Sequence, residues 1–182
     1  SPEDAKRLFA ALDFRFRATG ADIELSAEYG RGLEIHERLR ERTNPRTSMD
    51  MVVYAPANLK LSVWAVDGAV RVRGWNAPLE VRTTRGDVRA EGLKSKVISV
   101  LCPSCSIHVS GVNGGSVRCM GGSGAVELED VQGTQIFVET SSGAQTLSRV
   151  SGEQLYLSKT GPISGRDLLG QIEFQSKGGA ID

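Results

Sequence analysis

The sequence lacks both an excess of charge of one sign and a long apolar run. Its 22 Lys and Arg residues balance its 22 Asp and Glu residues, so no net field attracts nucleic acid or an anionic membrane. No apolar run approaches the roughly 18 residues that span a bilayer. We therefore expect no nucleic-acid partner and no transmembrane segment in the sequence as given.

Aromatic residues are scarce as well, at 5%, whereas the chain of 182 residues contains 21 glycines. Many glycines and few large rings indicate many tight turns rather than a few large packed elements. The length suits one domain, or one domain with a short appendage.

The sequence does contain an internal repeat, which begins at Leu61. An apolar residue and a second one two positions later recur about every 19 residues. A turn glycine follows in most repeats, and a second alternating apolar pair comes after it. The first apolar pairs are Leu61-Val63, Leu79-Val81, Ile98-Val100, Val117-Cys119, Ile136-Val138, Leu155-Leu157 and Ile172-Phe174.

Alternation with a period of two is typical of strands that bury one face. One repeat cannot bury its apolar stripe alone, but stacked repeats can. We therefore predict a mainly β protein, a single-stranded parallel β-helix (β-solenoid) of about seven coils over residues 61–182. A β-sandwich of hairpins also uses short strands and glycine turns, but it rarely keeps so constant a spacing.

Two features depart from the regular repeat. Gln145 takes an inward position that is otherwise aliphatic, so it should form hydrogen bonds within the core or mark a bulge. The last coil is incomplete and is expected to expose unpaired backbone groups, which favours self-association through this end.

Residues 1–60 do not follow the repeat and are predicted to form a small α+β cap over the first coil. Ser1 and Pro2 open a short helix, with Leu8, Phe9 and Leu12 on its apolar face. The next stretches, "DFRFRAT" and "ADIELSAEYG", indicate a hairpin. A charged loop over 31–48 follows, and "MDMVVYAPANLKLSV" is a strand that leads into the solenoid.

The segments "SPEDAKRLFAAL", "MVVYAPANLKLSVWAVDGAVRVRGW", "LEVRTTRGDVRAEGL" and "VETSSGAQTL" carry a family resemblance. Together they resemble a bacterial adhesin-like family of β-strand-repeat proteins, a domain family of unknown function. The resemblance covers most of the chain and implies an extracytoplasmic setting: periplasm, cell surface or membrane-anchored. It also implies an upstream signal or anchor that is absent from the sequence as given, and it brings no catalytic residues.

Binding candidates come from the outward positions of the repeat. Arg71, Arg89 and His108 fall in one outward row, and Trp64 falls in another outward position. Mixed signs along these rows are also typical of a solvated surface with ion pairs, such as Arg73 over Glu91. All four residues are therefore candidates for contacts with a partner.

Three cysteines leave several kinds of chemistry open. Cys102 and Cys105 flank a bend in "VLCPSCSI", where Cys105 takes the position of the turn glycine. The repeat places this pair on the surface of the third coil, as a disulfide or as free thiols. A zinc site needs four convergent ligands, whereas His108 points outward and Cys119 inward, so we expect no metal.

We therefore expect a non-enzymatic, envelope-associated binding or structural module that presents flat solenoid faces to an unknown protein or glycan. We expect no catalytic residues and no cofactor. One alternative is a glycan-active β-helix enzyme, which needs paired carboxylates in a groove. The other is a scaffold that stacks end to end through its C-terminal coil.

Overall fold

The computed structural model describes residues 12–19, 22–29, 54 and 56–182 of a chain that divides into two units, 1–54 and 55–182. In the first unit, β1 (Leu12–Thr19) and β2 (Asp22–Tyr29) pair in antiparallel register, which confirms the predicted hairpin. Leu12 begins β1 rather than extending a helix, because apolar residues alternate at positions 12, 14, 16 and 18. The predicted helix over residues 1–11 and the charged loop lie outside the described residues, so the cap over the first coil stays a prediction.

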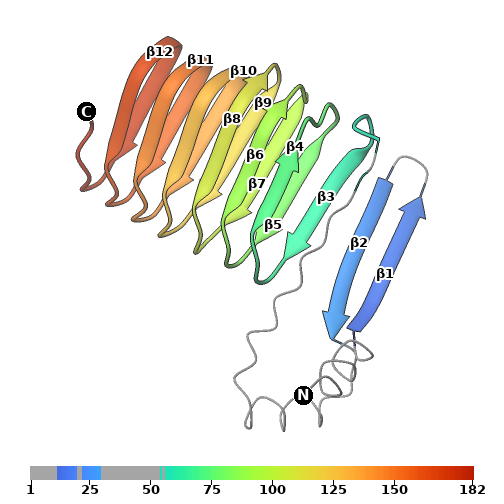
Figure 1. Cartoon of the computed structure of the whole chain (residues 1–182). Helices are drawn as coiled ribbons and strands as arrows, with labels where there is room; N and C mark the ends of the chain where they lie inside the picture. Colours follow the sequence, from blue (N-terminus) through green and yellow to red (C-terminus); the bar gives the residue numbers. More distant parts are fainter. Residues whose placement is uncertain (1–11, 20–21, 30–53, 55) are drawn as a thin grey trace, which may run out of the picture. The chain divides into compact units, whose positions relative to one another are not determined.

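The second unit is a parallel β-solenoid of about six turns, with a repeat of about 19 residues. Figure 1 shows its coils side by side, from β3 to β12. Its strands are β3 (Lys60–Ala65), β4 (Val70–Arg73), β5 (Leu79–Thr83), β6 (Val88–Leu93), β7 (Val97–Cys102), β8 (Ile107–Asn113), β9 (Ser116–Gly121), β10 (Val126–Thr140), β11 (Gln145–Ser158) and β12 (Ile163–Ser176). The described residues include no helix, and hence none that could cross a membrane.

The strands form two layers. In the first layer, β3, β5, β7 and β9 pair in that order and continue into the second halves of β10, β11 and β12. In the second layer, β4, β6 and β8 continue into the first halves of the same three strands. The predicted solenoid is confirmed, although with about six turns, because past β12 only the bridge Ile163↔Ile181 follows in the second layer.

Burial of the inward residues holds the two layers together. Val81, Val100, Val109 and Val126 are each 0% exposed, which follows from their alternation with polar neighbours. The turns also stack closely. A Cβ at Gly143 would collide with the carbonyl oxygen of Gly124 in the preceding coil, so this turn requires glycine.

The prediction that Leu155 and Leu157 point into the core is wrong. β11 is one residue shorter than β10 between the pairs Gln132↔Ser151 and Gln135↔Glu153. This register shift turns Gln154 and Tyr156 inward, at 2% and 0% exposed, and turns both leucines outward. The Tyr156 ring then stacks on Phe174 of the next coil, with ring centroids 5.3 Å apart.

Two buried glutamines are bonded within this part of the core. Gln145 Nε2 donates to Leu157 O at 2.7 Å and to Thr140 Oγ1 at 3.0 Å, which confirms the bonding role predicted for this residue. Gln154 Nε2 donates to Leu169 O at 2.8 Å, and Gln154 Oε1 accepts from Tyr156 OH at 2.7 Å. The chain itself thus satisfies both Nε2 groups and Gln154 Oε1, whereas Gln145 Oε1 is buried without a hydrogen-bond partner among the described residues.

The boundary between the two units falls after Tyr54 rather than after residue 60. Trp75 is buried and donates from Nε1 to Leu59 O at 2.9 Å. Asn76 N donates to Ala57 O at 2.9 Å. The segment before β3 is thus already part of the first coil. Within the predicted leading strand, residues 49–53 and 55 lie outside the described residues, and the strand itself begins at Lys60.

Candidate functional site

Two ladders of outward side chains run across the second layer, one residue from each coil. The row of Arg71, Arg89 and His108 and the pair Arg73 and Glu91 were predicted from the repeat, and the strand register extends both rows to the last coil. We call this surface the polar face. Its first ladder is Arg71, Arg89, His108, Glu127, Thr146 and Ser164; its second ladder is Arg73, Glu91, Ser110, Glu129, Ser148 and Arg166.

A third row lies at the corner that follows the second ladder, and sequence reasoning missed it. Each of its residues has a left-handed backbone, with φ between 53° and 65°. In the first three coils the residue is glycine, but in the last three it carries charge, which is uncommon for non-glycine residues. The glycines at repeat spacing were the signal that could have revealed it. The row is Gly74, Gly92, Gly111, Asp130, Arg149 and Asp167.

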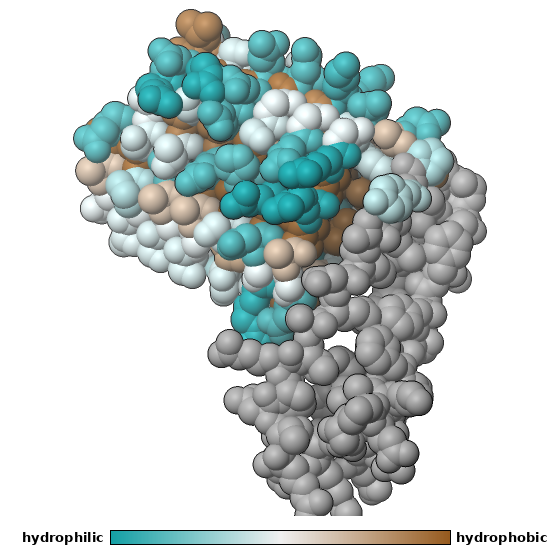
Figure 2. All heavy atoms as spheres, in the orientation of Figure 1, coloured by the Kyte–Doolittle hydropathy of each residue, from teal (hydrophilic) through white to brown (hydrophobic). Residues whose placement is uncertain are grey.

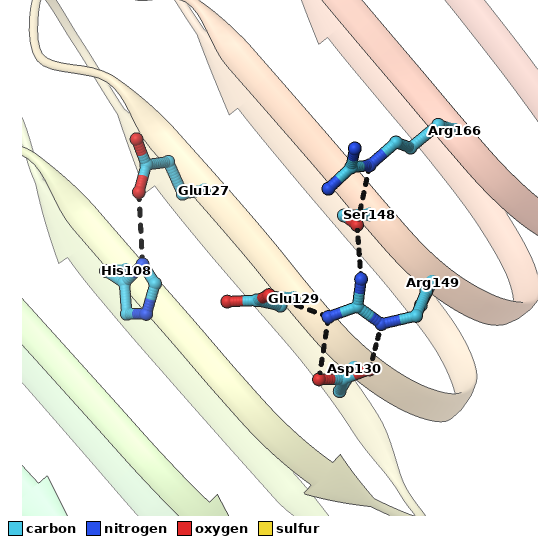
Figure 3. A network of polar contacts seen from close by, with 7 residues as sticks. All are labelled: His108, Glu127, Glu129, Asp130, Ser148, Arg149 and Arg166. Carbon is cyan, nitrogen blue, oxygen red and sulfur yellow. Dashed lines mark hydrogen bonds and ion pairs between the residues drawn. The ribbon is translucent and has the colours of Figure 1, made fainter.

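Arg149 is the centre of a polar network on this face, drawn in Figure 3. Its Nη2 donates to Glu129 Oε1 at 2.7 Å and to Asp130 Oδ2 at 3.0 Å, and its Nη1 donates to Ser148 Oγ at 3.2 Å. Arg166 Nε donates to the same hydroxyl at 3.1 Å. The hydrogen bond from Arg149 lowers the pKa of Asp130, so this carboxylate stays ionised.

Polar side chains also pair between the earlier coils. Arg73 Nε donates to Glu91 Oε2 at 2.7 Å, and His108 Nδ1 lies 3.1 Å from Glu127 Oε2. The hydrogen bond from Arg73 lowers the pKa of Glu91, and the charges of Arg71 and Arg89 lower it further. Both of those arginines are exposed. Among the described residues, neither has a carboxylate within ion-pair distance.

Trp64 is exposed, as the alternation predicts, at 71%. It lies in β3 of the first layer, with the Arg82 guanidinium 5.7 Å from its ring centroid. The structure therefore brings Arg71, Arg89 and His108 together on one ladder, but it does not bring Trp64 to them. Figure 2 shows hydrophilic and hydrophobic surface interleaved across the face in view.

A groove of about 570 Å³ lies on the first layer, over β9 to β12. Phe137 and Leu155 contribute apolar surface, and the Arg118 guanidinium lies 5.1 Å from the Phe137 ring centroid. Glu153 and Glu173 line the same groove. Sequence reasoning missed this groove because Leu155 faces outward only after the register shift in β11.

Cys102 and Cys105 are joined by a disulfide, with their Cα atoms 5.6 Å apart. Their predicted placement on the surface is wrong, because they are 0% and 5% exposed and close the core beneath the turn. Cys119 is a free, buried thiol, and burial raises its pKa to about 12. The part of the chain that the structure describes contains no group of three His, Cys, Asp or Glu side chains placed to hold a metal ion.

Comparison with known proteins agrees with this architecture. The family model described as Toastrack DUF4097, a domain of unknown function with a repeat β fold, matches residues 18–181. No curated protein and no solved structure matches the chain. The match spans nearly the whole sequence, including every coil of the solenoid, and so the chain belongs to the Toastrack family.

Proposed function

We propose that this Toastrack chain is a non-enzymatic binding module of the bacterial cell envelope, adhesin-like in role, which presents its polar face to a protein or a glycan. The observation that carries the proposal is the polar face itself. It is a flat surface fixed by the strand register and by ion pairs between coils. Solenoid faces of this kind serve as extended binding surfaces.

The charge states on this face favour binding over catalysis. A general acid needs a carboxyl group whose pKa is raised toward neutrality. Asp130 and Glu91 have lowered pKa values instead, because arginines donate hydrogen bonds to them. Such ionised groups suit recognition of a partner.

The disulfide supports the envelope setting. Disulfides form and persist in oxidising compartments such as the periplasm and the cell surface, and are rare in the bacterial cytosol. Cys102 and Cys105 close the turn of the third coil with such a bond. The balanced net charge further favours a partner other than nucleic acid.

Retention and turnover of cell-wall polysaccharides test the proposal in one experiment. Purified protein is incubated with each polysaccharide, and both the bound fraction and the new reducing ends are measured. We expect the protein to bind at least one polysaccharide, or a purified envelope protein incubated with it in the same way. We expect no new reducing ends in any sample. Turnover in any sample would contradict the non-enzymatic proposal.

A glycan-active enzyme is the second candidate, and the groove favours it. Glu153 and Glu173 are two carboxylates in one groove, the arrangement that glycoside hydrolysis uses. If this candidate is correct, Glu153→Gln and Glu173→Gln each abolish release of reducing ends, whereas Glu127→Gln on the polar face leaves it unchanged. Release that survives both groove variants would reject this candidate.

A further inference from the structure

Charged neighbours in adjacent coils of this solenoid pair with opposite signs. Arg73 binds Glu91, Arg149 binds Asp130, and Arg85 binds Asp67 through Nη2 at 2.7 Å. Arg71 and Arg89 break this rule, because the strand register places them directly opposite each other. Coils stand about 4.8 Å apart, and like charges at this separation destabilise the pairing.

The side chains of Arg71 and Arg89 are both exposed to solvent. Glu91 lies two residues after Arg89 in β6, and its carboxylate already accepts the hydrogen bond from Arg73. Both guanidinium groups nevertheless lower the pKa of Glu91 through their charge, as expected for two residues opposite each other in neighbouring strands. A ligand with a negative group at this place would remove the repulsion between them.

We propose that Arg71 and Arg89 bind the carboxylate groups of an acidic polysaccharide. This inference rests on the proposed binding function and names its ligand class. Guanidinium groups hold carboxylates through paired hydrogen bonds, and two of them one strand apart can hold one carboxylate between them or two in succession.

The rest of the face favours a sugar polymer over a polyanion without hydroxyl groups. Beyond His108, the first ladder carries Glu127 and then the hydroxyls of Thr146 and Ser164. An inorganic polyphosphate chain would meet Glu127 and would offer no hydroxyl group to Thr146 and Ser164. In an acidic polysaccharide, carboxylates are separated by hydroxyl groups, which serine and threonine can bind.

Affinity electrophoresis tests the site with polygalacturonate as the probe. The full chain is run through native gels with and without the polymer, and the retardation gives an apparent affinity. We expect the double variant Arg71→Gln/Arg89→Gln to lose about tenfold in affinity. The double variant Lys159→Gln/Lys177→Gln changes the net charge equally at two exposed positions outside the polar face and the groove, and it should keep wild-type retardation. Wild-type retardation should also fall as salt is raised.

Four results would overturn the proposal. One is wild-type mobility unchanged by polygalacturonate, and another is equal retardation of the Arg71→Gln/Arg89→Gln variant, with thermal unfolding showing it folded. The third is binding through these arginines to phosphatidylglycerol vesicles but not to polygalacturonate, which would assign the site to lipid. Wild-type binding to a neutral polysaccharide, unaffected by the variant, would reject the acidic ligand while leaving the proposed binding function standing.

Discussion

At the scale of single residues, the shifted sixth coil depends on Tyr156. Its ring stacks on Phe174 and its hydroxyl donates to Gln154 Oε1 inside the core. Tyr156→Phe leaves that amide oxygen unpaired and should cost about 1 kcal/mol of unfolding free energy. Tyr156→Ala also removes the ring and should cost about 3–5 kcal/mol. Urea unfolding measures both, and wild-type stability in Tyr156→Phe would contradict the assigned hydrogen bond.

At the corner position 130, a glycine should destabilise the fold less than an alanine. Asp130→Gly and Asp130→Ala both lose the bonds to Arg149, but only alanine keeps the cost of a left-handed backbone, φ 53°. We expect the glycine variant to be more stable by about 1 kcal/mol. At neighbouring Glu129, which has no positive φ, the order should reverse because glycine weakens a strand. The same order at both positions would reject the explanation.

The same carboxylates predict a response to acid. The pKa values of Asp130 and Glu91 lie below their ordinary values of 3.8 and 4.5, because Arg149 and Arg73 donate hydrogen bonds to them. A lowered pKa stabilises the fold above the unfolded value, and this contribution is lost as pH falls through the folded value. The urea midpoint should therefore drop below about pH 4, and less steeply in Asp130→Asn. If the urea midpoint of Asp130→Asn falls as far in acid as that of the wild type, the Asp130–Arg149 pair has no role in this response.

At the scale of elements, a disulfide closes the turn of the third coil, and Cys119 is a buried free thiol. In the folded, unreduced protein we expect no reactive thiol, because Cys119 is 0% exposed. Unfolding without reductant should expose one thiol, that of Cys119, because the other two cysteines are joined by the disulfide. Unfolding with reductant should expose three thiols. Titration with a thiol reagent counts them directly. Three thiols in the unfolded, unreduced chain would rule out the bond.

Most of the solenoid was predictable, because the alternation of Val81, Val100 and Val109 with polar residues has one interpretation once the repeat is recognised. The same register predicted the ladder of Arg71, Arg89 and His108. The sixth coil was not predictable in this way. "QLYL" contains two overlapping alternations, Gln154-Tyr156 and Leu155-Leu157, and hydrophobicity alone favours the second. A one-residue deletion in the preceding corner decides between them, and no local pattern marks it.

At the scale of the whole molecule, the last coil is the place where we propose self-association. Leu169 and Ile172 of β12 are 70% and 38% exposed, and Ile181 is 47% exposed. Grouped apolar side chains of this size favour contact with another copy. Sedimentation should show a molar mass that rises with concentration, and Leu169→Ser/Ile172→Ser should suppress the rise. Val97→Ser, at an exposed apolar position outside β12, is the control. A monomer at every concentration would refute self-association.

The left-handed corner has a consequence for how such chains can diverge. Gly111 and Arg149 occupy equivalent corners, yet the inward neighbours that follow them, Val112 and Val150, are equally buried. One corner can thus gain or lose a charged group while the interior beside it stays the same. Surface charge and core packing therefore depend on separate positions of each repeat, so the surface chemistry of the stack can change one coil at a time.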